Sequence, residues 1–198
     1  MADLETLPQR SMPMPRLYTI GHSNLGFEAF AEGLRAHGIE VLADVRAAPY
    51  SRRYPQFSRD ALEAALAGQQ IRYRWLGKTL GGLRNPQGPT PHTALAEPAF
   101  QAYAKHMASE AFIHTVDRLC EGAHRLRIAL MCAEANPHHC HRQFIADALC
   151  VRGLEVWHIQ NAQTVVAHAP HPGLRVVDQQ LVYDRHSQSG LFAFEDPA

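Results

Sequence analysis

Short apolar segments alternate with segments of helical spacing along most of this chain, and few folds accommodate that order. The apolar segments predict strands over 17–20, 39–45, 71–75, 127–132 and 154–159. The helical patterns predict helices over 27–36, 58–68, 99–107, 111–120 and 139–151. Because this alternation is typical of a mostly parallel sheet with helices on both faces, we predict an α/β fold. A length of 198 residues favours a single domain.

The two ends of the chain and one internal segment depart from this alternation. The composition predicts a proline-rich leader over 1–16, the α/β domain over 17–160 and an irregular C-terminal extension over 161–198. Residues 77–98 are rich in Gly, Pro and Thr, which predicts a long loop of the kind that often closes over a site. In the extension we expect three histidines to be exposed: His168, His171 and His186.

Cysteine content and charge exclude several classes of protein. Four cysteines are too few for a disulfide scaffold, and a formal charge of zero argues against a surface that coats nucleic acid or an anionic membrane. The N-terminus has neither the basic nor the apolar segment of a secretory signal. The most apolar stretch, 128–133, is too short to span a bilayer. We therefore expect a cytoplasmic protein with reduced thiols and no membrane partner.

The neutral average hides a basic segment between residues 46 and 84. Only two acidic residues oppose its eight basic ones, and aromatic residues are interleaved with them. Guanidinium groups bind phosphate or carboxylate, and aromatic rings stack on other rings, so this mixture suits a nucleotide-like or otherwise anionic ligand. The alternative is that the arginines lie on separate solvated faces. The basic residues are Arg46, Arg52, Arg53, Arg59, Arg72, Arg74, Lys78 and Arg84, and the aromatic ones are Tyr50, Tyr54, Phe57, Tyr73 and Trp75.

Polar residues follow three of the predicted strands directly. Ligands of such sheets bind outside the carboxyl ends of the strands, near the point where the strand order reverses. We therefore expect three distant segments to converge on one edge of the sheet. They are Gly21-His22-Ser23-Asn24, Asp44-Val45-Arg46 and Cys132-Ala133-Glu134.

The same segments resemble the motifs of a known family, the domain of unknown function 488. The matching residues are TIGHS at 19–23, DVR at 44–46 with Pro49 and Ser51, LGG at 80–82, CAE at 132–134 and CHR at 140–142. The resemblance extends in chain order from about residue 18 to residue 159. It implies a Rossmann-like three-layer sandwich with the motif residues gathered at one site. It implies no established reaction.

Cys140 is the candidate nucleophile of this site. It lies where the helix over 139–151 is predicted to begin, and the free amides and positive potential of a helix N-terminus lower a cysteine pKa. His141 or His139 would then carry the proton, and Arg142 would bind an anion. The alternative is an inert buried thiol, since an apolar helix face follows.

Two strand-end carboxylates are candidates for proton transfer. Glu134 ends the core strand and is separated from Cys140 by a short loop, and Asp44 ends another strand two residues before Arg46. Two carboxylates in one cleft suit acid–base chemistry. For Asp44 the alternative is an ion pair with Arg46 or Arg142.

Neither a dinucleotide nor a bound metal is predicted as a cofactor. The turn over 21–26 lacks the glycine spacing of a dinucleotide fingerprint and the Lys-Ser/Thr end of a nucleoside-triphosphate loop. Zinc is the alternative, because Cys132, His138, His139, Cys140 and His141 form a dense group of nitrogen and sulfur ligands. Against zinc, no Cys-x-x-Cys pair is present, and neighbours in sequence cannot all face one ion.

These patterns favour an enzyme, a hydrolase or transferase, that acts on an anionic substrate derived from a nucleotide or nucleic acid. The partner is thus an anionic small molecule or a nucleic-acid fragment, and the oligomeric state stays open. Alternatives are a non-catalytic nucleotide or nucleic-acid binding module and a Cys/His metal-binding protein. The catalytic candidates are Cys140, Glu134 and Asp44. The substrate-binding candidates are Gly21, His22, Ser23, Arg46, Ser51, Tyr73, Gly81, Gly82, Cys132, His141 and Arg142.

Overall fold

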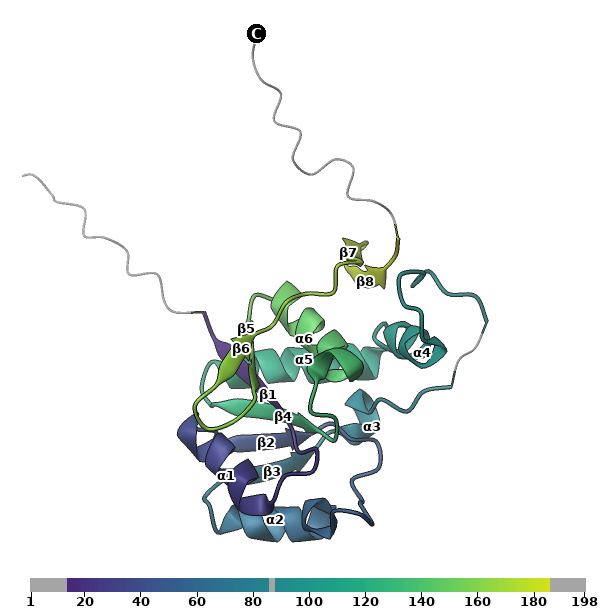
Figure 1. Cartoon of the computed structure of the whole chain (residues 1–198). Helices are drawn as coiled ribbons and strands as arrows, with labels where there is room; N and C mark the ends of the chain where they lie inside the picture. Colours follow the sequence, from purple (N-terminus) through teal and green to yellow (C-terminus); the bar gives the residue numbers. More distant parts are fainter. Residues whose placement is uncertain (1–13, 86–87, 186–198) are drawn as a thin grey trace, which may run out of the picture.

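Six strands form the central sheet of the computed structural model of this chain, in the order β3-β2-β4-β1-β5-β6 (Figure 1). The structure describes residues 14–85 and 88–185, so the predicted leader up to residue 13 and His186 lie outside the described residues. β1 to β5 are parallel, and β6 runs antiparallel to β5 at one edge. The strands are β1 (Arg16–Gly21), β2 (Val41–Asp44), β3 (Arg72–Trp75), β4 (Ile128–Cys132), β5 (Glu155–Ile159) and β6 (Val165–Ala167).

Helices cover both faces of this sheet (Figure 1). α1 (Phe27–Ala36) and α2 (Arg59–Ala67) lie on one face, and α5 (Glu110–Ala123) and α6 (Arg142–Val151) lie on the other. Two clusters of buried apolar side chains fill the layers; Phe30 and Leu66 belong to one, and Phe112 and Leu149 to the other. The predicted α/β class, the mostly parallel sheet and the Rossmann-like sandwich in a single domain are confirmed.

The burial of each strand follows from its place in the sheet. β4 lies between β2 and β1, and all five of its residues are buried, as its uninterrupted apolar sequence requires. β3 lies at the edge, where Arg72 and Arg74 are exposed and Tyr73 between them is buried. The alternation in the sequence predicted this half-exposed strand.

The order of the strands creates a switch point between β1 and β4. The chain leaves β1 through α1 toward β2, whereas it leaves β4 through α6 toward β5 on the opposite side of β1. The two connections thus diverge at the carboxyl ends of adjacent strands, where Gly21 pairs with Cys132. A crevice at this position is the expected ligand site of such a sheet.

The structure adds one helix to the predicted ones, and another begins later than predicted. Within the expected long loop, α3 (Gly77–Leu80) forms a single helical turn, and α4 (Pro98–His106) follows the loop. Gly77 is required there, because a Cβ at this position would lie 1.9 Å from the carbonyl oxygen of Arg46. α6 begins at Arg142 rather than at residue 139, because a 3₁₀ turn over Pro137–His139 comes before it.

The described part of the C-terminal extension contains more regular structure than its sequence pattern indicates. β6 adds to the central sheet, and β7 (Leu174–Val177) and β8 (Gln180–Tyr183) form a separate hairpin. These strands have three or four residues each, too few for a period of two to stand out between Gly and Pro. Among the described residues, no helix has both the length and the apolar character needed to cross a bilayer.

Candidate functional site

A cavity of about 590 Å³ opens at the carboxyl ends of β1, β2 and β4. The lining includes many of the residues that the sequence singled out: His22, Ser23, Arg46, Ser51, Gly82, Cys132, Glu134, Cys140 and His141. The other lining residues are Asn24, Ala47, Ala48, Tyr50, Arg53, Tyr54, Leu83, Ala99, Phe100, Ala133 and His139. The remaining candidates, Gly21, Asp44, Tyr73, Gly81 and Arg142, are not part of the lining.

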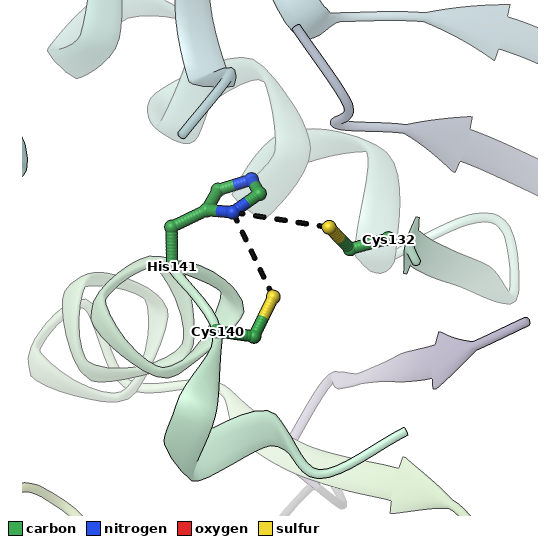
Figure 2. Close-up of side chains that lie close together, drawn as sticks. All are labelled: Cys132, Cys140 and His141. Carbon is green, nitrogen blue, oxygen red and sulfur yellow. Dashed lines mark hydrogen bonds between the residues drawn. The ribbon is translucent and has the colours of Figure 1, made fainter. Parts of the chain in front are cut away.

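Two thiols and one imidazole meet at the floor of the cavity (Figure 2). Nδ1 of His141 lies 3.6 Å from Sγ of Cys140 and 3.9 Å from Sγ of Cys132. Nε2 of the same ring lies 3.0 Å from the carbonyl oxygen of Val45. Because a carbonyl oxygen only accepts, Nε2 carries the hydrogen in neutral His141, and the Nδ1 lone pair faces both sulfur atoms.

The two thiols have opposite acidities. Burial by itself would raise the pKa of Cys140, but its contacts with Cys132, His141 and Arg142 outweigh burial and hold that pKa well below its usual value. The hydrogen bond to Cys140, burial and the Glu134 carboxylate raise the pKa of Cys132. The backbone N–H of Arg142, at the start of α6, also lies 3.5 Å from Sγ of Cys140. Cys140 is therefore the more acidic of the two thiols.

Glu134 occupies the open side of this cluster. Its Oε2 accepts a hydrogen bond from Sγ of Cys132 at 2.8 Å, and its side chain is exposed. The loop that carries it crosses directly over the end of β1. A Cβ on Gly21 would lie 1.9 Å from the carbonyl oxygen of Glu134, so this crossing requires a glycine. Gly21 thus shapes the site without lining it.

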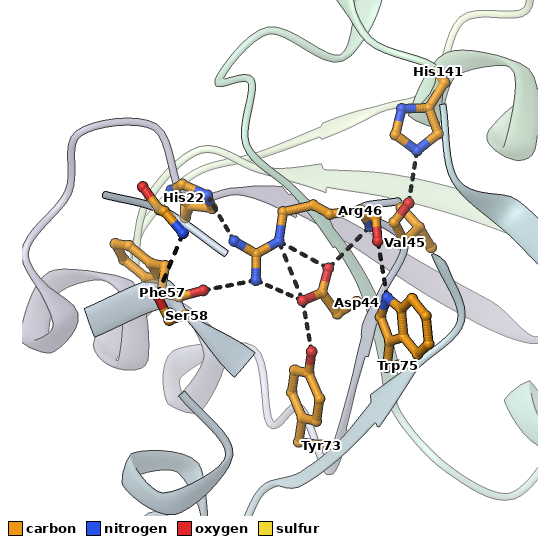
Figure 3. A network of polar contacts seen from close by, with 10 residues as sticks. His22, Asp44, Val45, Arg46, Phe57, Ser58, Tyr73, Trp75 and His141 are labelled. Atoms are coloured by element: carbon orange, nitrogen blue, oxygen red, sulfur yellow. Dashed lines mark hydrogen bonds and ion pairs between the residues drawn. The ribbon is translucent and has the colours of Figure 1, made fainter. Parts of the chain in front are cut away.

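Arg46, which lines the cavity, forms a buried ion pair with Asp44 (Figure 3). Nη2 of Arg46 lies 2.6 Å from Oδ2 of Asp44, and the hydroxyl of Tyr73 donates to the same oxygen at 2.7 Å. Nη2 of Arg46 also donates to the carbonyl oxygen of Phe57 at 2.8 Å. Asp44 is fully buried, so the ion pair that the sequence left as an alternative is present, and this carboxylate does not reach the cavity.

His22 lines the cavity beside Arg46 and contacts this ion pair. Its Nδ1 donates to the carbonyl oxygen of Ser23 at 3.0 Å, its Nε2 accepts from Nη1 of Arg46 at 3.3 Å, and its ring stacks on Phe57 at 4.3 Å. Burial and the charge of Arg46 lower the pKa of His22 to about 4. Both ring nitrogens of a neutral imidazole are thus already paired, so His22 positions Arg46.

Arg142 is directed away from the cavity. It is 1% exposed, and its guanidinium donates to Oγ1 of Thr19 at 3.2 Å and to the carbonyl oxygens of Glu134 and Ala135. Its Nε lies 3.4 Å from Sγ of Cys140. This arginine therefore supports the Glu134 loop and the Cys140 sulfur, whereas the sequence predicted an anion-binding side chain.

The paired glycines allow the backbone to approach the cluster closely. A Cβ on Gly82 would lie 2.5 Å from Nδ1 of His141, and a Cβ on Gly81 would lie 2.7 Å from Cβ of Ala47. Residues with a Cβ at either position would displace the imidazole or the loop after β2. Gly82 thus makes room for the imidazole, and Gly81 makes room for the loop after β2.

The rim of the cavity is basic and aromatic. The Arg53 guanidinium lies over the ring of Tyr54 at 5.5 Å, and the side chain of Tyr50 is 69% exposed. Phe100, in the first turn of α4, also lines the cavity, as does Leu83. The basic segment predicted Arg53 and the two tyrosines. Nothing in the sequence pointed to Phe100, because apolar lining residues have the same pattern as core residues.

A second polar network lies on the other side of β1 and extends to the site. Nδ1 of His158 pairs with Oγ1 of Thr19 at 2.7 Å, and its Nε2 pairs with Nδ1 of His168 at 3.0 Å. Nε2 of His168 pairs with Asp147 at 2.9 Å. Thr19 also accepts a hydrogen bond from Arg142, whose Nε contacts Sγ of Cys140. A chain of hydrogen bonds therefore leads from Asp147 to Arg142 and so to the Cys140 sulfur. The side chain of His168 is 1% exposed, so the expectation that it is exposed was wrong.

Comparison with known proteins identifies a family but no characterised relative. A family model described as domain of unknown function DUF488 matches residues 26–149. No curated protein matches the chain. No solved structure matches it either.

Proposed function

The chain belongs to the family of the domain of unknown function DUF488, and from this premise we propose that it is an enzyme acting on an anionic, ring-bearing substrate. The substrate class is a nucleotide or a fragment of nucleic acid, and the reaction is a hydrolysis or a group transfer in the cavity. The observation that carries this proposal is the meeting of two thiols, an imidazole and a carboxylate at the floor of a cavity with a basic, aromatic rim.

The rim supplies two kinds of interaction for such a substrate. Arg46 is neutralised by Asp44, so the exposed guanidinium of Arg53 supplies the charge that attracts a phosphate or carboxylate. Tyr50 and Phe100 offer ring faces on which a base would stack. Because Arg53 attracts the anion by its charge, we predict that added salt weakens binding. Because Phe100 stacks on the base, we predict that affinity also depends on the shape of the ligand's ring.

The floor supplies the reactive groups. Glu134 reaches the cavity with an exposed carboxylate and is the candidate for proton transfer. The thiols of Cys132 and Cys140 need a reducing compartment to stay free, which suits the cytoplasm. Asp44 has no free oxygen for catalysis, because Arg46 binds its Oδ1 and both Arg46 and Tyr73 bind its Oδ2.

A binding titration tests the substrate class. Purified full-length protein is titrated with the four ribonucleoside monophosphates and with a short single-stranded oligonucleotide at two salt concentrations. Arg53→Ala is expected to weaken binding roughly 10-fold or more, as the loss of a charge-assisted hydrogen bond does. The matched control is Arg72→Ala, which removes an exposed arginine of β3 that does not line the cavity. Equal effects of the two substitutions, or no binding at all, would overturn the proposal.

Turnover separates an enzyme from a binding module. The same ligands are incubated with the protein and their products are identified by mass spectrometry. Glu134→Gln is expected to abolish turnover while leaving the dissociation constant unchanged, because the amide keeps the shape of the carboxylate but not its basicity. Binding without turnover of any ligand in the wild type would replace the enzyme with a non-catalytic nucleotide-binding module.

A further inference from the structure

We propose that Cys132, Cys140 and His141 bind a zinc ion and that its fourth position holds a water molecule directed into the cavity. The zinc site stands on the geometry of these three residues alone. The use of its water on a nucleotide-type substrate rests on the function proposed above. In this arrangement Cys140 is a metal ligand rather than the nucleophile that the sequence suggested.

The spacing of the three ligand atoms fits the ion. Sγ of Cys132, Sγ of Cys140 and Nδ1 of His141 all lie within 4.8 Å of one another. Zinc bonds of about 2.3 Å to sulfur and 2.0–2.1 Å to nitrogen, at a tetrahedral angle, place sulfur and nitrogen about 3.6 Å apart. The structure has 3.6 Å from Nδ1 to Cys140 and 3.9 Å from Nδ1 to Cys132 (Figure 2).

The imidazole is already held in the orientation that a metal needs. Metal-binding histidines usually donate their second ring N–H to a carbonyl or carboxylate, which fixes the ring and raises its basicity. Nε2 of His141 makes this contact with the carbonyl oxygen of Val45 at 3.0 Å (Figure 3). Cys132 ends β4, whereas Cys140 and His141 are adjacent in sequence and directly precede α6. The objection that sequence neighbours cannot all face one ion is answered by the observed geometry, because Sγ of Cys140 and Nδ1 of His141 lie 3.6 Å apart.

Glu134 is the proton carrier of this centre and not its fourth ligand. Its carboxylate contacts Cys132 but does not belong to the group of ligand atoms that lie within 4.8 Å of one another. Catalytic zinc sites keep one position open for water, whereas structural sites are closed by four protein ligands. Here the ligands line a cavity, and the Glu134 side chain is exposed toward it. Two cysteines, one histidine and a non-ligand glutamate are also the set with which zinc deaminases of nucleobases activate water.

The reaction step that this centre supports is a hydrolysis. The zinc-bound water transfers a proton to the Glu134 carboxylate, and the resulting hydroxide forms a bond to an electrophilic carbon of the substrate. The bond from that carbon to its leaving group then breaks, and the leaving group takes the proton from Glu134. One water molecule is consumed, and no electrons are exchanged.

Metal analysis of the full-length protein tests the site without any substrate. The reduced protein is incubated with zinc sulfate, freed of weakly bound metal by gel filtration and analysed by mass spectrometry of the elements. We expect one zinc per chain in the wild type and in the control Cys120→Ser, since Cys120 lies on α5 and does not belong to the group of ligands. Cys140→Ser should lower zinc affinity by more than the roughly 10- to 100-fold that the loss of an outer hydrogen-bond partner costs.

The absorption spectrum of the cobalt-loaded wild-type protein tests the metal site even if the Cys140→Ser variant does not fold. Wild-type protein titrated with Co²⁺ should develop the visible bands of a tetrahedral ion and the ultraviolet charge-transfer band of thiolate ligands. Wild-type protein that holds less than one zinc per chain and shows neither cobalt band would overturn the zinc site. A Cys140→Ser variant that folds and binds zinc like the wild type would also overturn it. Loss of the metal would leave nucleotide binding through Arg53 intact, whereas zinc without nucleotide binding would overturn the proposed substrate class.

Discussion

A buried histidine makes the stability of this fold sensitive to acid. His158 is 5% exposed, and its two ring nitrogens pair with Thr19 and His168. Burial, and then the charges of His168, Arg142 and His138, lower the pKa of His158 to about 3, and only Cys140 opposes them. A proton on this ring would remove the acceptor for the Thr19 hydroxyl. The folded protein therefore keeps His158 neutral at a pH where the unfolded chain does not.

The size of this effect follows from the two pKa values. As the pH falls below 6.5, the unfolded chain binds a proton at His158 and the folded chain does not, so the free energy of unfolding decreases. Between pH 7 and pH 5 the loss is about 2 kcal/mol for this one group, and it continues toward the folded pKa of about 3. This is a substantial share of the about 5–15 kcal/mol that stabilises a typical domain.

Urea unfolding at the two pH values measures this loss through the fluorescence of Trp75 and Trp157. The His158→Gln variant keeps an N–H donor but cannot bind a proton. Its free energy of unfolding should therefore fall by about 2 kcal/mol less than that of the wild type between pH 7 and pH 5. His114→Gln removes an exposed histidine of α5 and is the matched control. If His158→Gln and the wild type lose equal free energy over this interval, the reasoning is refuted.

Three further substitutions test the supports of the site. Asp44→Asn leaves the Arg46 guanidinium buried without a countercharge, so urea unfolding should show a loss of about 3–5 kcal/mol. Gly21→Ala drives a Cβ into the carbonyl oxygen of Glu134, and differential scanning calorimetry should show a loss of about 1–3 kcal/mol. Gly82→Ala drives a Cβ into the imidazole that faces the two thiols; the fold should persist in circular dichroism while zinc affinity falls roughly 10- to 100-fold.

The architecture and the place of the site could be predicted because both depend on periodicity. The apolar sequence of β4 predicts a central strand, and the alternation of Arg72, Tyr73 and Arg74 predicts an edge strand. Parallel strands all end on one edge, so the convergence of residues after β1, β2 and β4 follows from the strand predictions alone. Tertiary contacts were not needed for any of these steps.

The direction of each side chain could not be predicted, because it depends on which partner lies nearest in space. Arg142 looks like an anion-binding residue in sequence, yet the carbonyl oxygens of the Glu134 loop take up its guanidinium. Asp44 looks like a catalytic acid, yet Arg46 and Tyr73 bind both of its oxygens. Residue types thus identify the groups at the edge, and only packing decides which of them face the cavity.

The hydrogen bonds around Arg142 extend the candidate site beyond the matched family segment. The family model covers residues 26–149, but Thr19 precedes that segment, and His158 and His168 follow it. These residues form the chain that positions Arg142 against the Cys140 sulfur. β5 and the start of the extension, which carry none of the motifs, therefore also support the candidate site. A fragment cut at the limits of the family match would keep both thiols but lose the network that holds one of them in place.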